Sequence, residues 1–183
     1  MKRIIEIIIG ISLLGLFAQP VYAVPGIADT SAHPVETSTS ALVDDRAIRL
    51  KAFLASFDSP MQNEADHFVR EADRLGLDWK LVAAIAGVES TFGHHVPSNS
   101  FNGWGWGIFT GASDGIHFTS WKSGITEVSE GLKYNYIDRG ATSLEAIGRM
   151  YAASPAWSAH VQFFMQKIDD FDLKGIEHLA VTI

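Results

Sequence analysis

The residue with the clearest chemical potential is Glu89, within the apolar stretch LVAAIAGVESTFG at residues 81–93. Leu81, Ile85 and Glu89 recur every four residues, so a helix would place this carboxyl group on an apolar stripe. Desolvation by that stripe and the negative end of the helix dipole would both raise its pKa. A carboxylic acid that stays protonated near neutral pH can act as a general acid. Position alone favours a plainer interpretation, in which Glu89 turns outward into water or accepts hydrogen bonds from neighbouring backbone N–H groups.

A loop rich in glycine and tryptophan follows this stretch. Residues 101–108 read FNGWGWGI, which places two indole rings between three glycines, and Trp121 adds another ring further along. Glycine lets the backbone approach a ligand closely, and flat aromatic faces suit the apolar face of a sugar ring. The alternative is a small aromatic core that seals the loop, in which Trp106 and Trp121 would take part.

Helices must position these residues. Apolar residues at helical spacing, with capping residues around them, predict six helices, at about residues 46–57, 60–75, 79–92, 121–132, 143–151 and 155–168. Asp78 is expected to cap the third helix, and Thr142 with Glu145 to form a capping box at the fifth. Strand signals are nearly absent. The predicted fold class is therefore mainly α, with a small irregular lobe at residues 94–119 between helices.

The first 44 residues differ in composition from the rest. Lys2 and Arg3 precede an apolar run, and the small residues that signal peptidase requires follow at residues 21–23. We therefore expect a cleaved signal peptide at residues 1–23; an uncleaved anchor would need about 20 apolar residues, more than the run has. Residues 24–44, rich in Ser, Thr, Pro and Ala, are expected to form a flexible linker before a folded domain at residues 45–183. The expected location is the periplasm, the cell wall or the outside of the cell.

Charge and composition exclude several partners. The net charge is −7, and removal of residues 1–23 would make it −8, whereas nucleic-acid binders carry a basic surface. The chain has no cysteine, so it can have neither disulfides nor cysteine-ligated metal. His94 and His95 are adjacent and would point in different directions, which makes a poor chelate. We expect no metal, no cofactor, no nucleic-acid partner and no membrane span after signal cleavage.

The region around Glu89 resembles a known catalytic helix. Residues 72–93, ADRLGLDWKLVAAIAGVESTFG, are similar to the lysozyme-like superfamily and especially to the soluble lytic transglycosylases. In those enzymes an alanine-rich helix ends in Glu-Ser-x-Phe, and the glutamate is the general acid. Glu89, Ser90 and Phe92 occupy those positions here.

Downstream, the chain resembles glycoside hydrolase family 73, the endo-β-N-acetylglucosaminidases of bacterial cell walls. Asn102–Ile108 is similar to that family's Asn-x-Phe-Gly-Ile segment, and Phe118–Trp121 to its aromatic-serine entry into the next helix. Tyr151–Trp157 resembles its Tyr-Ala-x-Asp-Pro-x-Tyr signature, with Ser154 for the aspartate and Trp157 for the last tyrosine. The resemblance covers about residues 62–170.

The resemblance implies a lysozyme-like fold and a role for each matching residue. Glu89 would protonate the glycosidic oxygen between two amino sugars, and Tyr151 would line the cleft near the N-acetyl group, unless it is simply a core tyrosine. Substrate contacts are implied for Ser90, Phe92, Asn102, Trp104, Trp106 and Trp121. Family 73 often carries a second carboxylate, and in the short lobe only Asp114 offers one. Hydrolysis with Asp114 as base, substrate-assisted hydrolysis and lytic transglycosylation therefore all stay open.

The leading functional prediction is an endo-β-N-acetylglucosaminidase that cleaves β-1,4 bonds in peptidoglycan glycan strands with Glu89 as general acid. One alternative is a lytic transglycosylase in which Glu89 is the sole acid and base. Another is a non-catalytic module that binds peptidoglycan or takes part in envelope assembly. An enzyme of this size without a wall-binding repeat would need a recruiting protein, whose identity the sequence does not indicate.

Overall fold

The computed structural model describes residues 44–107, 115–152 and 154–173. Every described residue belongs to one compact unit. The expected signal peptide at residues 1–23 and the linker at residues 24–44 therefore lie outside the described residues, except for Asp44. Asp44 belongs to the folded domain, because its carboxylate accepts a hydrogen bond from the backbone N–H of Arg46 and caps the first helix.

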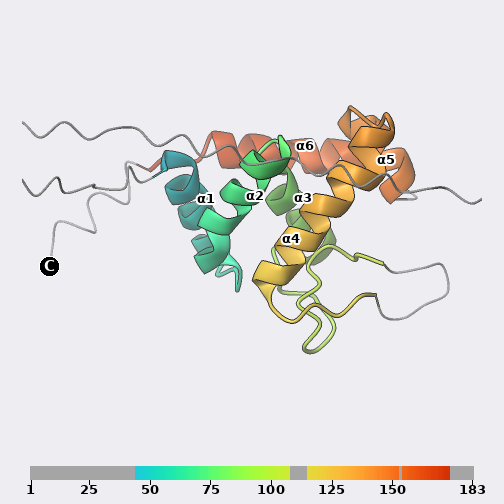
Figure 1. The fold of residues 1–183 in the computed structure, drawn as a ribbon. Coiled ribbons are helices and arrows are strands. Elements are labelled where there is room, and N and C mark those ends of the chain that lie inside the picture. The colour runs from blue at the N-terminus through green and yellow to red at the C-terminus, as the bar shows by residue number, and fades with distance from the viewer. Residues whose placement is uncertain (1–43, 108–114, 153, 174–183) are drawn as a thin grey trace, which may run out of the picture. The chain divides into compact units, whose positions relative to one another are not determined.

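The described residues form helices and irregular segments and contain no strand, which confirms the prediction of a mainly α protein (Figure 1). Short turns of 3₁₀-helix precede α2 and follow α4, and a turn of π-helix continues α4 directly. In chain order the elements are α1 (Asp45–Ala55), η1 (Gln62–Glu64), α2 (Ala65–Leu75), α3 (Leu81–Ser90), α4 (Trp121–Gly131), η2 (Leu132–Tyr136), η3 (Ile137–Arg139), α5 (Leu144–Tyr151) and α6 (Trp157–Asp169).

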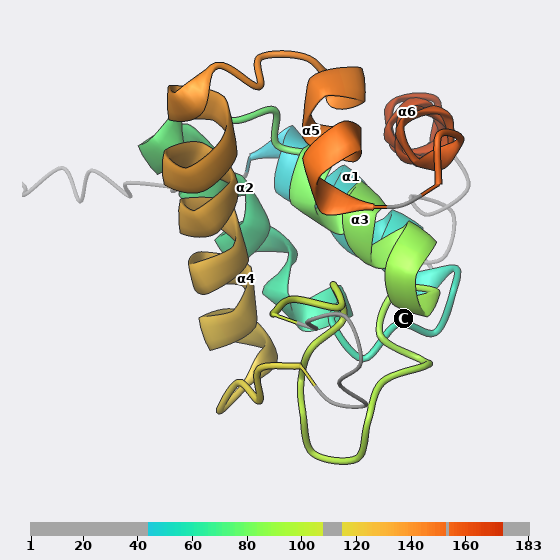
Figure 2. The same ribbon diagram turned by 90° about the vertical axis from the view of Figure 1, so that its right-hand side faces the viewer.

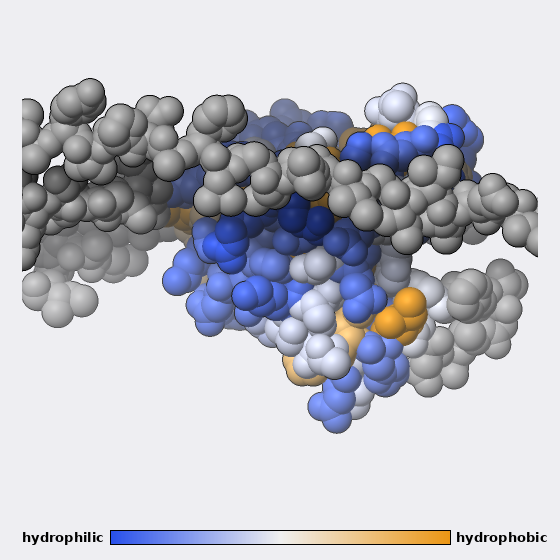
Figure 3. Space-filling view, viewed as in Figure 1, coloured by the Kyte–Doolittle hydropathy of each residue, from blue (hydrophilic) through white to orange (hydrophobic). Residues whose placement is uncertain are grey.

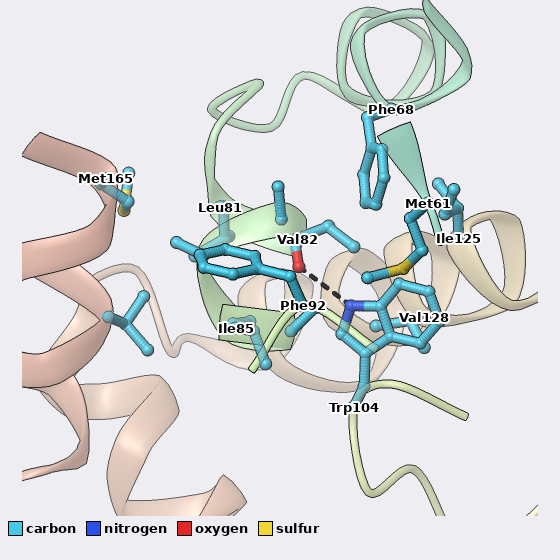
Figure 4. Packing of buried hydrophobic residues seen from close by; sticks show 14 of the residues in the cluster. Met61, Phe68, Leu81, Val82, Ile85, Phe92, Trp104, Ile125, Val128 and Met165 are labelled. Atoms are coloured by element: carbon cyan, nitrogen blue, oxygen red, sulfur yellow. Dashed lines mark hydrogen bonds between the residues drawn. The ribbon is translucent and has the colours of Figure 1, made fainter. Parts of the chain in front are cut away.

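Helix α3 is the centre of this arrangement. It packs against α6 on one side and α4 on the other, while α1 packs on α2, α2 on α4, and α5 on α6 (Figure 2). Every residue from Leu81 to Gly87 is buried. The small side chains of its alanine run let neighbouring helices approach closely, and larger side chains such as Phe68, Phe92 and Trp104 fill the space around them (Figure 4).

Several helix boundaries differ from the predicted ones. The first helix ends at Ala55 instead of Phe57, and Phe57 is 38 % exposed, whereas Phe53 is 3 % exposed. The fifth helix is capped by Ser143, whose hydroxyl accepts the N–H of Ala146, instead of by Thr142. Asp78 accepts the backbone N–H of Lys80, but α3 begins at Leu81 instead of Trp79 and its N-cap is Lys80, so the prediction that Asp78 caps this helix is wrong.

The segment between α3 and α4 is irregular wherever it is described, in agreement with the predicted lobe at residues 94–119. Its two described parts are joined by backbone hydrogen bonds from Ile116 to the Trp106 carbonyl and from Phe118 to the Ser100 carbonyl.

The space-filling view of the molecule shows a largely hydrophilic face with small apolar areas (Figure 3). Within the described part of the chain, no helix has the length and apolar character needed to cross a membrane.

Candidate active site

Helix α3 ends immediately after Glu89, for a reason that lies in the residues that follow. Thr91 and Phe92 both have left-handed backbone angles, with φ of +51° and +56°. Such angles end a helix, and non-glycine residues adopt them only when other contacts hold them there. Here the Phe92 ring turns back onto the helix, so close to Gly87 that a Cβ on that glycine would lie 2.6 Å from the ring. The helix therefore stops at Ser90, two residues earlier than predicted.

Glu89 sits at the rim of the core. The residue is exposed, in contrast to the dry position predicted from the apolar stripe. The stripe argument is wrong because α3 is surrounded on nearly all sides, so exposure depends on where its neighbours end and not on helix face. Its carboxyl oxygen Oε1 accepts a hydrogen bond of 2.7 Å from the indole Nε1 of Trp157 on α6.

The pKa of Glu89 reflects its position at the rim of the core. Burial of the carboxyl against its neighbours raises its pKa, and the Trp157 N–H, which favours the carboxylate, partly offsets that rise. Among the described residues no cation forms an ion pair with Glu89. The raised pKa agrees in direction with the sequence prediction, and a carboxyl group shifted this way is suited to donate a proton.

Tyr151 lies beside Glu89 at the end of α5. Its ring stacks on Trp157, with centroids 4.9 Å apart and planes at 25°, and its hydroxyl donates a 2.6 Å hydrogen bond to the Trp104 carbonyl. Burial raises the pKa of Tyr151 well above its usual value, and the negative charges that Glu89 and Tyr136 can carry raise it further. Tyr151 is therefore neutral at physiological pH, partly exposed, and close enough to Glu89 for their charges to interact.

Two more rings extend this surface. The Trp106 ring lies 5.9 Å from Tyr151 and 6.1 Å from Tyr136, and the two tyrosine rings are 6.1 Å apart. Trp106, Tyr136 and Tyr151 are partly exposed, and Trp157 is 3 % exposed. We call these four residues the aromatic wall. Flat rings beside an acid of raised pKa are suited to a saccharide substrate.

Sequence reasoning missed two members of the aromatic wall as site residues. Trp157 was expected only as part of the core stripe of its helix, although its position in the Tyr151–Trp157 signature offered a signal. Tyr136 gave no signal, because it reaches the wall through the π-helical turn η2. A π-helical turn changes the direction of side chains relative to the preceding α-helix and often occurs at functional sites.

Trp104 and Phe92 belong to the core, so their predicted contacts with substrate are wrong. Both are 0 % exposed, and the Trp104 indole N–H donates to the Val82 carbonyl of α3 at 2.9 Å (Figure 4). Phe92 packs among the rings of Phe53 and Phe164. Neither side chain can present a face to a sugar.

Ser90 and Asn102 are also structural, which corrects their predicted substrate contacts. They are 3 % and 5 % exposed. The Ser90 hydroxyl donates to the Gly103 carbonyl at 2.7 Å and accepts the Gly93 N–H at 2.9 Å. The Asn102 side-chain amide donates to the carbonyls of Trp106 and Ile116, and its oxygen accepts the Trp106 N–H. Together they fix the loop that carries Trp106.

The remaining predicted residues take no part in the aromatic wall or lie outside the described residues. Trp121 is partly exposed, but it packs edge-on against Phe101 and Trp104, as in the aromatic-core alternative. Asp114, the predicted second carboxylate, lies outside the described residues. His94 bonds to the Phe57 carbonyl, and the described residues contain no group of three or more metal-ligating side chains.

Two surface pockets are present near these elements. One, of about 460 Å³, lies between α5 and α6 and is lined by Gly148, Arg149 and Ala152 among others. The other, of about 380 Å³, lies between α2 and α4 around His67. Glu89 lines neither, so its carboxyl is reached from the open surface beside the aromatic wall and not through these pockets.

Compared with known proteins, the chain matches no protein-family model and none of the curated proteins. The resemblance to lysozyme-like enzymes therefore stays a prediction that rests on the motifs around Glu89 and Tyr151.

Proposed function

We propose that the chain is an exported glycosidase that cleaves β-1,4 bonds in peptidoglycan glycan strands, of the endo-β-N-acetylglucosaminidase type. Glu89 protonates the glycosidic oxygen as its bond to the anomeric carbon breaks; a water molecule then forms the new bond to that carbon, and the proton it releases restores Glu89. Tyr151, Trp106 and Tyr136, the partly exposed rings of the aromatic wall, hold the sugars on either side. The proposal joins the motif resemblance to the chemistry of the described residues.

The observation that carries the proposal is the setting of Glu89. Its carboxyl is open to solvent, as contact with a polymeric substrate requires, yet burial against Trp157 and its surroundings raises its pKa. A general acid needs both properties, because it must touch the leaving oxygen and still carry a proton near neutral pH. A module that only binds glycan would gain nothing from a partly desolvated acid.

Lytic transglycosylation is the second candidate, and one observation favours it. The pKa of Glu89 responds to burial and to the Trp157 N–H, and no second carboxylate among the described residues contributes to its shift. Hydrolysis commonly uses a second carboxylate, whereas transglycosylation needs one group for both steps. Glu89 would then protonate the leaving oxygen, and would afterwards accept the proton of the substrate's own 6-hydroxyl as that oxygen attacks the anomeric carbon.

Zymography on purified peptidoglycan tests for catalysis. We expect the wild-type protein to clear the gel and Glu89→Gln to lose activity by about 100-fold or more, because removal of a general acid costs at least that much. Glu127→Gln is the matched control, since it removes an exposed carboxylate from α4, and it should clear normally. Equal clearing by Glu89→Gln and wild type would show that Glu89 is not the acid.

Mass spectrometry of the soluble products distinguishes the two reactions. Reducing ends on N-acetylglucosamine indicate the glucosaminidase, and 1,6-anhydro ends indicate the transglycosylase. Binding of peptidoglycan without soluble products from the folded wild-type protein would contradict both and would identify a binding module.

A further inference from the structure

The Glu89 carboxyl accepts a hydrogen bond from the Trp157 indole, which is itself held rigidly by its neighbours. Trp157 is 3 % exposed, and its ring is covered on one face by Tyr151 and lies close to Gly148, where a Cβ would approach to 3.1 Å. Tyr151 in turn is fixed by its hydrogen bond to the Trp104 carbonyl, and Trp104 is fully buried. The indole N–H that meets Glu89 is therefore anchored through the core, across a sequence separation of 68 residues.

An indole N–H can only donate a hydrogen bond. In a neutral carboxylic acid one oxygen is the carbonyl acceptor and the other carries the proton. Because Trp157 donates to Oε1, and the carbonyl oxygen of a neutral acid is the stronger acceptor, the hydrogen bond favours the form with the proton on Oε2. The side chain thus has one preferred arrangement, although it lies on an exposed rim where a carboxyl group would otherwise rotate.

We propose that Trp157 is the positioning residue of the site: its indole N–H fixes Glu89 so that Oε2 is the oxygen that gives and takes the proton. The inference rests on the proposed function, which makes Glu89 the general acid. Among the described residues, Tyr151 on α5 is the titratable group whose charge interacts with that of Glu89, and Tyr136 on η2 lies beside Tyr151; the pKa of each tyrosine is raised above its usual value. Both are neutral at physiological pH, so the Trp157 N–H is the polar contact that orients the acid.

The test is Trp157→Phe, which keeps an aromatic ring beside Tyr151 and removes the N–H. The lost hydrogen bond favoured the carboxylate, so we expect the pKa of Glu89 to rise and the basic limb of the pH–rate profile to move upward by about half a pH unit or more. We also expect kcat to fall about tenfold or more because the acid is no longer oriented, with KM little changed. An unchanged basic limb would overturn the proposal.

Val161→Ala controls for loosened packing of α6. Val161 is 0 % exposed, so its truncation weakens the core without touching the N–H. It should lower thermal stability and leave the basic limb in place. If Val161→Ala moves the limb as Trp157→Phe does, Trp157 has a merely structural role.

A measurement on the wild-type chain avoids dependence on the folding of either variant. In heteronuclear NMR, the indole N–H resonance of Trp157 should follow the ionisation of Glu89, and this pH dependence should disappear in Glu89→Gln. An indole signal indifferent to pH would overturn the proposal even if zymography confirms Glu89 as the acid. A signal that titrates while Glu89→Gln retains full activity would refute the proposed function and leave the hydrogen bond established.

Discussion

At the scale of single residues, the site depends on a compromise at Glu89. Full burial would hold a proton but exclude a polymer, and full exposure would admit the polymer but give an ordinary carboxylate. The end of α3 provides an exposed residue, and α6 provides a buried indole that covers one carboxyl oxygen. The acid is thereby partly desolvated on one side and accessible on the other.

This compromise has a consequence for the stability of the wild-type protein. Because burial raises the pKa of Glu89 in the folded state, folded protein binds the proton more tightly than unfolded protein does. The contribution of Glu89 to stability is therefore greatest below its unfolded pKa, about 4.3. It is lost as pH rises through the folded value.

Glu89→Gln should consequently be more stable than wild type at neutral pH and no more stable below about pH 4. Because the carboxyl is exposed on one side, solvent limits the gain, and we expect an increase in Tm of roughly 1–3 °C. Thermal unfolding followed by circular dichroism across pH measures it. Glu127→Gln controls for net charge and should show a smaller difference at neutral pH. A Glu89→Gln variant less stable than wild type at neutral pH would contradict the desolvation argument.

At the scale of elements, the junction of α4 with η2 positions two residues of the aromatic wall, Tyr136 and Trp106. The helix continues as a π-helical turn, which carries Tyr136 to Trp106 and Tyr151. Gly131, at the end of α4, makes room for the Trp106 ring, since a Cβ there would lie 2.1 Å from it. Gly131 thus allows α4 and the loop that carries Trp106 to pack closely together.

Gly131→Ala is a direct test of that close approach. Alanine normally stabilises a helix relative to glycine by roughly 1 kcal/mol. Here we expect a loss of about 1–3 kcal/mol, because Trp106 must move away. Urea unfolding measures the change, and activity should fall as the wall is displaced. Ser129→Ala on the same helix is the matched control: its hydroxyl is buried without a hydrogen-bond partner, so its removal should be neutral or stabilising. A stabilised Gly131→Ala would refute the close approach.

At the scale of the described domain, the core around α3 holds the site together. Trp104 links three parts of it: its indole bonds to α3, its carbonyl receives the Tyr151 hydroxyl, and its ring packs near Phe68 on α2. The glycine- and tryptophan-rich loop, predicted as a sugar-binding surface, thus packs mainly into the core. Of its two tryptophans, only Trp106 reaches the candidate site.

Trp104→Phe tests whether Trp104 stabilises the core or binds sugar. We expect a loss of about 2–4 kcal/mol in stability, from the cavity and the lost hydrogen bond. Activity per folded molecule should be reduced far less than in Glu89→Gln. Trp79→Phe, at a half-buried position before α3, should cost less stability. An unchanged unfolding free energy together with a large loss of substrate affinity would instead support the original sugar-binding prediction.

The sequence predicted the helices well because their signals are local. The apolar spacing at Trp121, Ile125 and Val128 predicted α4, and that at Trp157 and Val161 predicted α6. The end of α3 was missed because Phe92 adopts its strained backbone to reach the core, a contact that local pattern does not contain. The motif resemblance singled out Glu89 and Tyr151, which lie close enough for their charges to interact, while Trp157 was missed as the partner of Glu89.

By itself, the sequence determined which segments are helical and which carboxyl group lies at the end of the apolar helix, since both follow from residue spacing along the chain. Only the tertiary structure decided which tryptophans are core and which face solvent, because Trp104 and Trp106 lie in one glycine-rich segment that reads alike around both. It also decided the orientation and the pKa of the Glu89 carboxyl group. Both depend on the Trp157 indole, 68 residues away, because the packing of α6 on α3 brings its Nε1 to 2.7 Å from Oε1 of Glu89.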